Sequence, residues 1–395
     1  MKCIVKHENN LTLVELSGKI TSQNAQEFEA SVCEEPAQTD GIVIDAKNLD
    51  FISSAGLRVL LKVKKRCKEK DFRIINVNDD VMNVFEVTGF SEIMSISKAV
   101  RSLSIKDCQK IGSGACGEVF RLDNETIVKL YYPRVPKESI EQEKALSKKA
   151  FILGIPTAIS YDIVDVDSRT GVVYELLNSK TLGELIGSDE KNIEKYAEMY
   201  ADVCRKIHST TVDDGFLPKF KDINREDIAL ISGVTDEERE YLYKFLNLVP
   251  ESPTCVHGDL NINNIMVQND ECCLIDMGEF SVGNAMFDIS RIVFSMSFAA
   301  DGSDYNKFYK MPQSTVDSLL TLFLKNYFGT DSLQEAERKN PDVMWLYPLA
   351  WFRCCTSFLK GDRWPREKRT QALSLLKEKL IPFVDEREKE KSNAE

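Results

Sequence analysis

The sequence predicts a small α/β domain followed by a larger α+β domain. Three observations support this division. Strand-like apolar runs alternate with helical patterns across residues 1–100. The pattern changes at Cys108, because residues 108–132 predict three strands joined by a glycine-rich turn and a second turn. After about Leu182 the apolar spacing is mostly helical.

The first hundred residues contain the elements of a complete α/β unit. In chain order we expect strands at 3–7, 11–18, 41–46 and 72–77, and helices at 54–68 and 79–87. The pair Asn9-Asn10 marks a turn between the first two strands. Ser53 or Ser54 is placed to cap the first of these helices.

The rest of the chain divides by the same patterns. We expect a linker at 101–107, a β-rich part at 108–178, a mostly helical part at 179–384 and a polar, frayed tail at 385–395. Within these parts the patterns predict a helix at 137–153, a strand at 172–177 and short strands at 265–267 and 273–275.

The composition excludes several classes of function. The net charge of −12 over 395 residues argues against a nucleic-acid or anionic-membrane partner, because such partners require a basic surface. No apolar run approaches the roughly 20 residues that cross a bilayer, and residues 1–10 lack the apolar segment of a secretory signal. The 11 scattered cysteines form no C-x-x-C pair, so we expect reduced thiols and a cytoplasmic location.

A glycine-rich turn is the first sign of phosphate binding. Gly112, Gly114 and Gly117 form a G-x-G-x-x-G pattern. In dinucleotide-binding folds such glycines lead directly into a helix, but here they lead into EVFRLD, a turn at Asn124 and TIVKLY. The pattern therefore predicts a hairpin that closes over nucleotide phosphates. Taken alone, it fits a surface hairpin without a ligand equally well.

A lysine on the strand after the hairpin is the second sign. Lys129 has the position of a kinase lysine that grips the α- and β-phosphates. Such a lysine needs a carboxylate to fix it, and we choose Glu143 on the next predicted helix, with Glu141 as the rival. The alternative is that either glutamate is only a solvent-exposed charge on the helix and does not contact Lys129.

The most specific motif begins at His257 and reads H-G-D-L-N-I-N-N. Asp259 is followed by Asn264 five residues later and, after two short apolar strands, by Asp276. Phosphoryl transfer requires this set of groups. Asp259 and Asn264 are the predicted catalytic residues, with Asp259 orienting or deprotonating the attacking hydroxyl. Asn264 and Asp276 would hold the Mg²⁺ that bridges the phosphates of ATP. An asparagine-rich turn is the alternative.

These motifs resemble the aminoglycoside phosphotransferase and choline kinase branch of the protein-kinase-like superfamily, over residues from about 108 to 300. Gly258 stands where protein kinases usually carry arginine, which is the form of that branch. The resemblance implies a bilobal kinase-like fold, ATP and Mg²⁺ as cofactors, and adenine contacts from backbone groups near Glu175 and Leu177. It also implies that Asp288, which opens the next helix, either holds the catalytic loop, our preference, or contacts substrate.

A second resemblance lies in the first domain. Residues 51–57 (FISSAGL) resemble the signature of STAS domains, the fold of bacterial anti-sigma factor antagonists. In that family a phosphorylated serine at this helix start controls partner binding, because phosphate adds negative charge to the binding face. Aligned on Gly56-Leu57, the usual phosphoacceptor position holds Ala55. Ser54 is thus a candidate phosphosite, and a helix cap is the preferred alternative.

These observations lead to two hypotheses about the function of the chain. The leading hypothesis is an ATP-dependent phosphotransferase that adds the γ-phosphate to a hydroxyl of a small molecule and carries a STAS regulatory or docking domain. The missing A-P-E element and the short segment between Asp276 and Asp288 disfavour a peptide substrate. The alternative is a signalling protein of the sigma-factor partner-switching type, whose kinase-like domain phosphorylates a protein serine or only binds nucleotide.

We interpret two further sets of residues as structural. His208 has the helical spacing of a core or helix-end histidine more than that of a catalyst. Five aromatic residues could line a substrate pocket, but such apolar stripes are more often core; they are Trp345, Tyr347, Trp351, Phe352 and Trp364.

Overall fold

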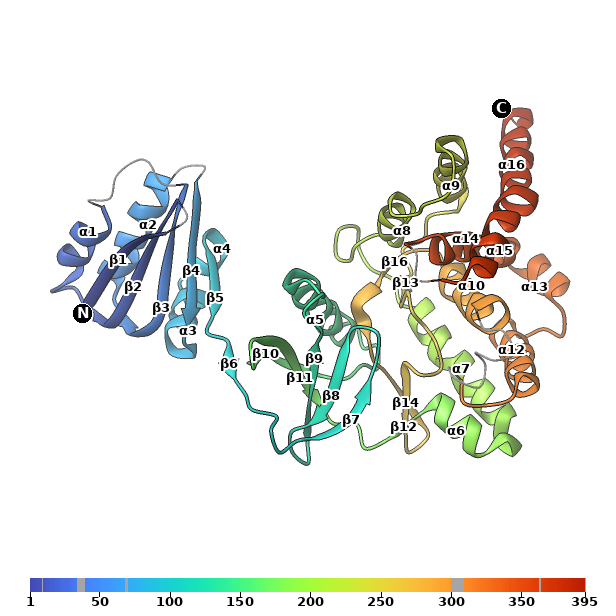
Figure 1. The fold of residues 1–395 in the computed structure, drawn as a ribbon, viewed down its shortest axis with the longest axis horizontal. Helices are drawn as coiled ribbons and strands as arrows, with labels where there is room; N and C mark the ends of the chain where they lie inside the picture. Colours follow the sequence, from blue (N-terminus) through green and yellow to red (C-terminus); the bar gives the residue numbers. More distant parts are fainter. Residues whose placement is uncertain (9, 34–39, 68–69, 300–308, 362–363, 395) are drawn as a thin grey trace. The chain divides into compact units, whose positions relative to one another are not determined.

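A computed structural model describes residues 1–8, 10–33, 40–67, 70–299, 309–361 and 364–394. The chain forms two compact units, Met1–Ser104 and Ile105–Glu395 (Figure 1). The first is an α/β unit, and the second combines a β-rich lobe with a helical lobe. The predicted fold class is therefore confirmed.

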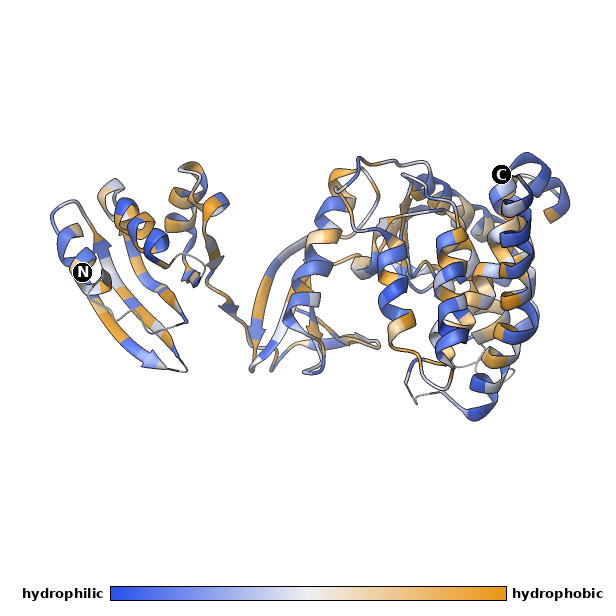
Figure 2. Ribbon diagram, turned by 90° about the horizontal axis from the view of Figure 1, so that it is seen from above, coloured by the Kyte–Doolittle hydropathy of each residue, from blue (hydrophilic) through white to orange (hydrophobic). Residues whose placement is uncertain are grey.

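The first unit is a five-stranded sheet with helices along one face (Figure 2). The strands lie in chain order, the first pair antiparallel and the others parallel. They are β1 (Lys2–Glu8), β2 (Leu11–Ile20), β3 (Gly41–Ile52), β4 (Asp71–Val77) and β5 (Ser95–Lys98), followed by the short β6 (Arg101–Ser102). The helices are α1 (Ala25–Cys33), α2 (Ser54–Cys67), α3 (Asp79–Val87) and α4 (Phe90–Ile93). Helices α1 and α4 and strand β5 were not predicted.

The N-terminal lobe of the second unit is an antiparallel sheet beside one long helix. Its strands follow the order β10-β11-β9-β8-β7. The helix, α5 (Lys137–Ile152), buries Ile140 against Tyr131 and Val172 of the sheet. The strands are β7 (Gln109–Ser113), β8 (Gly117–Arg121), β9 (Thr126–Tyr131), β10 (Ser160–Val166) and β11 (Arg169–Glu175).

The C-terminal lobe is mainly helical. Its helices are α6 (Leu182–Ser188), α7 (Ile193–His208), α8 (Phe220–Ala229), α9 (Asp236–Leu248), α10 (Met286–Phe294), α12 (Gln313–Phe328), α13 (Leu333–Lys339), α14 (Leu346–Phe358), α15 (Arg366–Leu375) and α16 (Ile381–Ala394). Its short strands are β12 (Lys180–Thr181), β13 (Cys255–Val256), β14 (Ile265–Gln268), β15 (Glu271–Leu274) and β16 (Ser281–Val282). In the part of the chain that the structure describes, no helix combines the length and apolarity needed to span a membrane.

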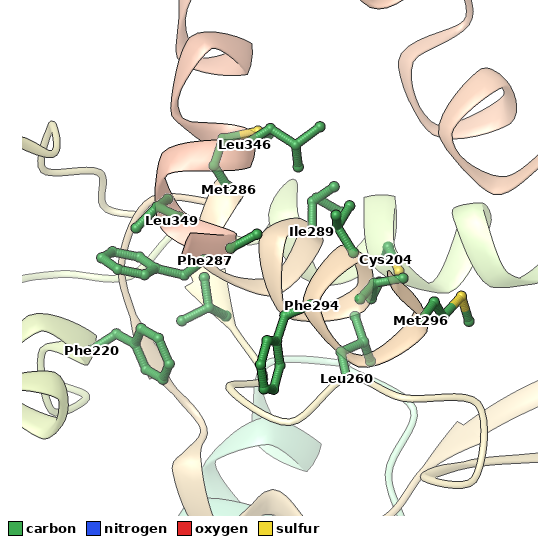
Figure 3. Close-up of a cluster of buried hydrophobic side chains, with 14 of the residues drawn as sticks. Cys204, Phe220, Leu260, Met286, Phe287, Ile289, Phe294, Met296, Leu346 and Leu349 are labelled. Carbon is green, nitrogen blue, oxygen red and sulfur yellow. The ribbon is translucent and has the colours of Figure 1, made fainter. Parts of the chain in front are cut away.

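Helix α10 lies at the centre of this lobe's core. Figure 3 shows its residues Phe287 and Phe294 among side chains from neighbouring elements, including Phe220 and Leu349. Leu260 joins the same core, is fully buried and its carbonyl accepts a hydrogen bond from the Tyr200 hydroxyl at 2.9 Å. Leu260 follows Asp259 directly, so the core fixes the loop that carries the predicted catalytic residue.

The tail prediction is wrong for the described residues, because 385–394 continue helix α16. The Tyr241 hydroxyl of α9 donates a hydrogen bond to Asp385 at 3.1 Å, and Lys244 lies 3.7 Å from Glu388. Arg387 pairs with Glu390 one turn further along α16. Charges that read as a solvated tail therefore form helix-surface pairs and contacts with α9.

Candidate active site

One cleft in the second unit collects every residue predicted to bind ATP, to bind metal or to act in catalysis. Its volume is about 2570 Å³. Its lining includes Gly112, Gly114, Gly117, Lys129, Glu143, Glu175, Leu177, Asp259, Asn264 and Asp276. The fold therefore brings together groups from the glycine hairpin, helix α5, strand β11 and the segment around β14 and β15.

The glycine-rich turn joins β7 and β8 tightly. The Gly114 amide donates a hydrogen bond to the carbonyl of Gly117 at 2.9 Å, which closes the turn. A Cβ added at Gly117 would lie 2.5 Å from the carbonyl oxygen of Leu130 on the next strand. Only glycine lets these two strands approach so closely, and the three glycines of the turn line the cleft.

Lys129 lies between two carboxylates. Its Nζ is 2.7 Å from Glu143 Oε1 and 3.0 Å from Asp276 Oδ1. Glu141, the rival, is exposed and lies 3.8 Å from Lys137 instead. Burial would lower the pKa of Lys129, but the charges of Asp276 and Glu143 outweigh burial and raise it. The lysine is therefore a fixed positive charge in the cleft.

Two tyrosines that the sequence analysis missed support this ion pair. The Tyr174 hydroxyl lies 3.4 Å from Glu143 Oε1, and the Lys129 ammonium lies 5.1 Å from the centre of the Tyr131 ring. Burial, with the nearby Glu143 charge, raises the pKa of both phenols. The tyrosines therefore stay neutral and hold the glutamate and lysine in place.

The predicted adenine-binding segment follows β11. Glu175 and Leu177 both line the cleft. The Glu175 carboxylate accepts a hydrogen bond from the Ile159 amide at 2.8 Å, and the Leu177 carbonyl accepts one from the Ser179 amide at 2.8 Å. The Glu175 side chain thus braces the segment, and the adenine contact of its backbone groups stays a prediction.

Asp288 holds the catalytic loop. Its side chain is fully buried and accepts hydrogen bonds from the amides of His257 at 2.7 Å and Gly258 at 2.8 Å. His208 Nε2 lies 3.1 Å from the same carboxylate, and His208 Nδ1 lies 2.7 Å from the Tyr327 hydroxyl. Asp288 and His208 therefore position the loop from inside the core, in agreement with the preferred interpretation of each.

Steric constraints explain why the H-G-D motif has glycine at its second position. Gly258 has a φ of 84°, a conformation that glycine adopts without strain. A Cβ at this position would lie 2.5 Å from Glu279 Cβ and 2.9 Å from the Phe220 ring. The arginine that protein kinases usually carry here has no space in this loop.

Asp259 is held by an arginine that the sequence analysis did not select. Arg291 donates to Asp259 Oδ1 from Nε at 2.9 Å and from Nη2 at 2.7 Å. Burial would raise the pKa of Asp259, but the charge and hydrogen bonds of Arg291 outweigh burial and hold it below its usual range. Asp259 is thus an oriented, ionised carboxylate. Arg291 lies one helical turn after Asp288 on α10. This spacing is the feature of the sequence that could have pointed to Arg291 as a neighbour of the loop.

The two predicted metal ligands lie beside each other. The Ile275 amide donates to the Asn264 carbonyl at 3.0 Å, which sets Asp276 next to Asn264. Asn264 Nδ2 donates to the carbonyl of Asp259 at 2.9 Å, and the Asp276 side chain is 43% exposed to the cleft. Within the described ranges no three His, Cys, Asp or Glu residues form a metal cluster. An amide, a carboxylate and nucleotide phosphates suit Mg²⁺, which takes few protein ligands.

Glu279 is a second carboxyl group near Asp259. Its Oε2 atom lies 3.8 Å from Arg291 Nη1, and neither atom has a hydrogen-bond partner among the described residues. The side chain is 37% exposed overall, but its Oε2 atom is buried. Desolvation raises the pKa of Glu279 from 4.5 to about 7, because the charge of Arg291 only partly offsets it and the charge of Asp259 adds to it.

We expect this shift to make stability depend on pH. Between pH 4.5 and about 7 the folded chain keeps a proton on Glu279 that the unfolded chain releases. The free energy of unfolding should therefore fall as pH rises through this window and level off above it. Glu279→Gln should remove this part of the slope in urea unfolding at several pH values. The exposed Glu335→Gln on α13 is the control, and an unchanged slope in Glu279→Gln would contradict the prediction.

The start of α2 in the first unit contains the candidate phosphosite. Helix α2 begins at Ser54, which is exposed, while Ala55 is partly buried. The Ser53 hydroxyl oxygen lies 3.4 Å from the Gly56 amide, which is the contact of a cap. Ser53 therefore has the capping position, and Ser54 faces solvent.

The five aromatic residues lie in three kinds of place: core, surface and cleft. Trp351 is partly buried and packs against the core. Trp345 and Phe352 are buried against Phe245, with ring centres 6.0 and 5.2 Å from it. Tyr347 is exposed, and Trp364 lines the cleft. Packing thus accounts for Trp345 and Phe352, and the cleft for Trp364.

Comparison with known proteins identifies both units. The family model described as "STAS domain" matches residues 2–103, and the model described as "Phosphotransferase enzyme family" matches residues 107–310. BtrV of Bordetella bronchiseptica, which carries the name of an anti-sigma factor antagonist, is 32% identical over 105 residues, or 25% of this chain and 88% of that protein.

Solved structures resemble the chain at lower identity. The ADP-bound crystal structure of aminoglycoside phosphotransferase APH(2'')-Ib is 19% identical and covers 68% of this chain and 91% of that chain, with a TM-score of 0.44. The amicoumacin kinase hAmiN, in complex with AMP-PNP, is 14% identical and covers 77% and 93%, with a TM-score of 0.44. The two family matches confirm both resemblances seen in the sequence: the chain belongs to the phosphotransferase enzyme family and carries an N-terminal STAS domain.

Proposed function

We propose that this chain is an ATP- and Mg²⁺-dependent phosphotransferase that phosphorylates a hydroxyl of a small molecule. The observation that supports this most is the arrangement of charges in the cleft. Lys129 lies within 3.0 Å of both Glu143 and Asp276, and Asp259 is hydrogen-bonded to Asn264. An ammonium group, metal-ligand oxygens and an oriented carboxylate are the parts that phosphoryl transfer uses.

The reaction assigns a task to each group. The acceptor hydroxyl oxygen attacks the γ-phosphorus of ATP, and a new O–P bond forms. The bond from the γ-phosphorus to the β,γ-bridging oxygen breaks, and its electron pair leaves with ADP. Asp259 orients the hydroxyl and accepts its proton as the O–P bond forms, then releases that proton to solvent. The Lys129 ammonium offsets phosphate charge, and Mg²⁺ held by Asn264 and Asp276 would neutralise the rest.

The segment after Asp276 supports a small acceptor. Only nine residues separate Asp276 from the first residue of α10, Met286. They contain a single helical turn, Met277–Glu279, and strand β16, which pairs with β13. This stretch leaves no long segment on which a peptide could dock, so an acceptor that enters the cleft is favoured.

The STAS domain would provide regulation or docking through a protein partner. Exposed Ser54 at the start of α2 is the residue that a phosphate could modify there, although Ser53 has the capping contact. A phosphate at this helix start would change the charge of the exposed face. We place this domain outside the chemical step.

The test is transfer of label from ATP carrying a labelled γ-phosphate. Purified full-length protein is incubated with amino sugars, choline-like alcohols, hydroxy acids, sugar phosphates and a purified STAS protein. We expect label on at least one small molecule and none on protein, and mass spectrometry of the same sample should find Ser54 unmodified. Label that enters protein and never a small molecule would favour the signalling alternative. ATP binding without any transfer would leave a nucleotide-binding module.

A further inference from the structure

Beyond the catalytic loop the cleft continues into a polar compartment, which we call the acceptor end. Helices α8, α10 and α14 and the residues after α14 contribute to its lining. Arg291, which holds Asp259, also lines it, so a molecule bound there lies next to the predicted base. The residues that define the acceptor end are Asp227, Glu279, Arg291, Arg353 and Lys360.

One carboxylate in the acceptor end faces two cations. Asp227 Oδ2 accepts a hydrogen bond from Arg353 Nη1 at 3.2 Å, and Asp227 Oδ1 accepts one from Lys360 Nζ. Asp227 and Arg353 are 16% and 15% exposed, while Lys360 is 40% exposed. Together these three side chains carry one excess positive charge. They are partly desolvated, so water screens this charge weakly.

The other charges of the acceptor end do not reverse this excess. The negative charge of Asp259 compensates the positive charge of Arg291, whose guanidinium donates two hydrogen bonds to it. Glu279 adds less than a full negative charge near neutral pH, because burial raises its pKa to about 7. Among the described residues, the acceptor end is therefore neutral to positive.

Three buried polar atoms at the acceptor end lack a hydrogen-bond partner in the part of the chain that the structure describes. Arg353 Nε, Arg291 Nη1 and Glu279 Oε2 have no hydrogen-bond partner among the described residues. Buried polar groups in folded proteins are normally paired, and these three belong to residues that line one compartment.

These charges discriminate between classes of acceptor. An aminoglycoside carries several ammonium groups, and each would be repelled by Arg353 and Lys360. Asp227 is already paired with both cations, and Glu279 adds only part of a negative charge near neutral pH. A carboxylate or phosphate would gain a charge-assisted pair with the same two side chains. We propose that the acceptor is a hydroxyl-bearing molecule with an anionic group, a carboxylate or phosphate, that pairs with Arg353 and Lys360. This inference rests on the proposed function.

The experiment compares small alcohols of different charge on full-length protein saturated with Mg-ADP. Calorimetry measures the dissociation constants of D-glycerate, glycerol phosphate, glycerol, ethanolamine and kanamycin. We expect D-glycerate or glycerol phosphate to bind about tenfold or more tightly than glycerol and ethanolamine, the size expected for one charge-assisted pair. Which of the two binds more tightly distinguishes a carboxylate from a phosphate.

Variants connect the preference to its residues. Arg353→Gln should weaken binding of the preferred anion about tenfold or more and leave glycerol unaffected. Lys360→Met should act in the same direction, and because Lys360 is more exposed, it keeps the test valid if Arg353→Gln unfolds. Lys325→Met removes an exposed lysine that pairs with Asp331 on the surface and is the matched control.

The outcomes that overturn the proposal are distinct from failure of the proposed function. Absence of anion binding, tighter binding of kanamycin or ethanolamine than of both anions, or unchanged anion affinity in both cleft variants would each overturn it. The proposed function fails separately, if the wild-type chain binds no Mg-ATP or transfers phosphate to no small molecule.

Discussion

Asp259→Asn is expected to slow phosphoryl transfer by about 100- to 10,000-fold, the range found for loss of a general base. The Asp259 carboxylate lies in the cleft, fixed by two hydrogen bonds from Arg291. Asparagine has the same shape but neither accepts the hydroxyl proton nor pairs fully with the guanidinium. ATP binding should remain close to that of the wild type, because the groups that would contact ATP and its metal are Lys129 and Asp276.

Two measurements check this expectation. Steady-state transfer to the acceptor found in the labelling panel gives the rate, and calorimetric titration with Mg-ATP gives the affinity. Asp331→Asn removes an exposed carboxylate that does not line the cleft and should leave both quantities unchanged. If Asp259→Asn transfers phosphate at the wild-type rate, Asp259 is not the base.

Asp276→Asn should abolish the dependence of ATP binding on Mg²⁺. Its carboxylate is exposed to the cleft and lies 3.0 Å from Lys129, so its loss removes a metal ligand and one of the two anions around that lysine. A contact to a charged group is worth about 1.5–3 kcal/mol, which corresponds to about 10- to 150-fold in affinity. Transfer should fall at least as much, because the phosphates lose both binding and charge neutralisation.

Titration with ATP in Mg²⁺ and in EDTA separates this effect from simple loss of folding. The wild-type chain should bind ATP more tightly in Mg²⁺, and Asp276→Asn should bind it equally weakly in both. Asp331→Asn is again the control and should retain the difference. A variant that keeps the full gain from Mg²⁺ would show that Asp276 does not hold the metal.

The sequence alone predicted the parts of the site that lie in local motifs. The glycine hairpin follows from the spacing of Gly112, Gly114 and Gly117 between two strand patterns, and the H-G-D motif fixes Asp259 relative to Asn264. Local backbone geometry decides such features, and local geometry is encoded by neighbouring residues. The sequence favoured Glu143 but left Glu141 as its rival near the same helix turn, and the structure sets Glu143 beside Lys129.

Other parts were decided only by tertiary packing. Arg291 reaches Asp259 across 32 positions, and His208 reaches Asp288 across 80. The charged end of α16 is helical and contacts α9 through Asp385 and Glu388. The excess positive charge of the acceptor end depends on Arg353 and Lys360 meeting Asp227 from more than a hundred positions away. The periodicity of a sequence tells which face of an element is apolar, but not which distant charges that face will meet. The sequence thus determined the two domains and the predicted phosphate-binding motifs, while the packing of α8, α10 and α14 decided how Asp259 is held and which charges line the acceptor end.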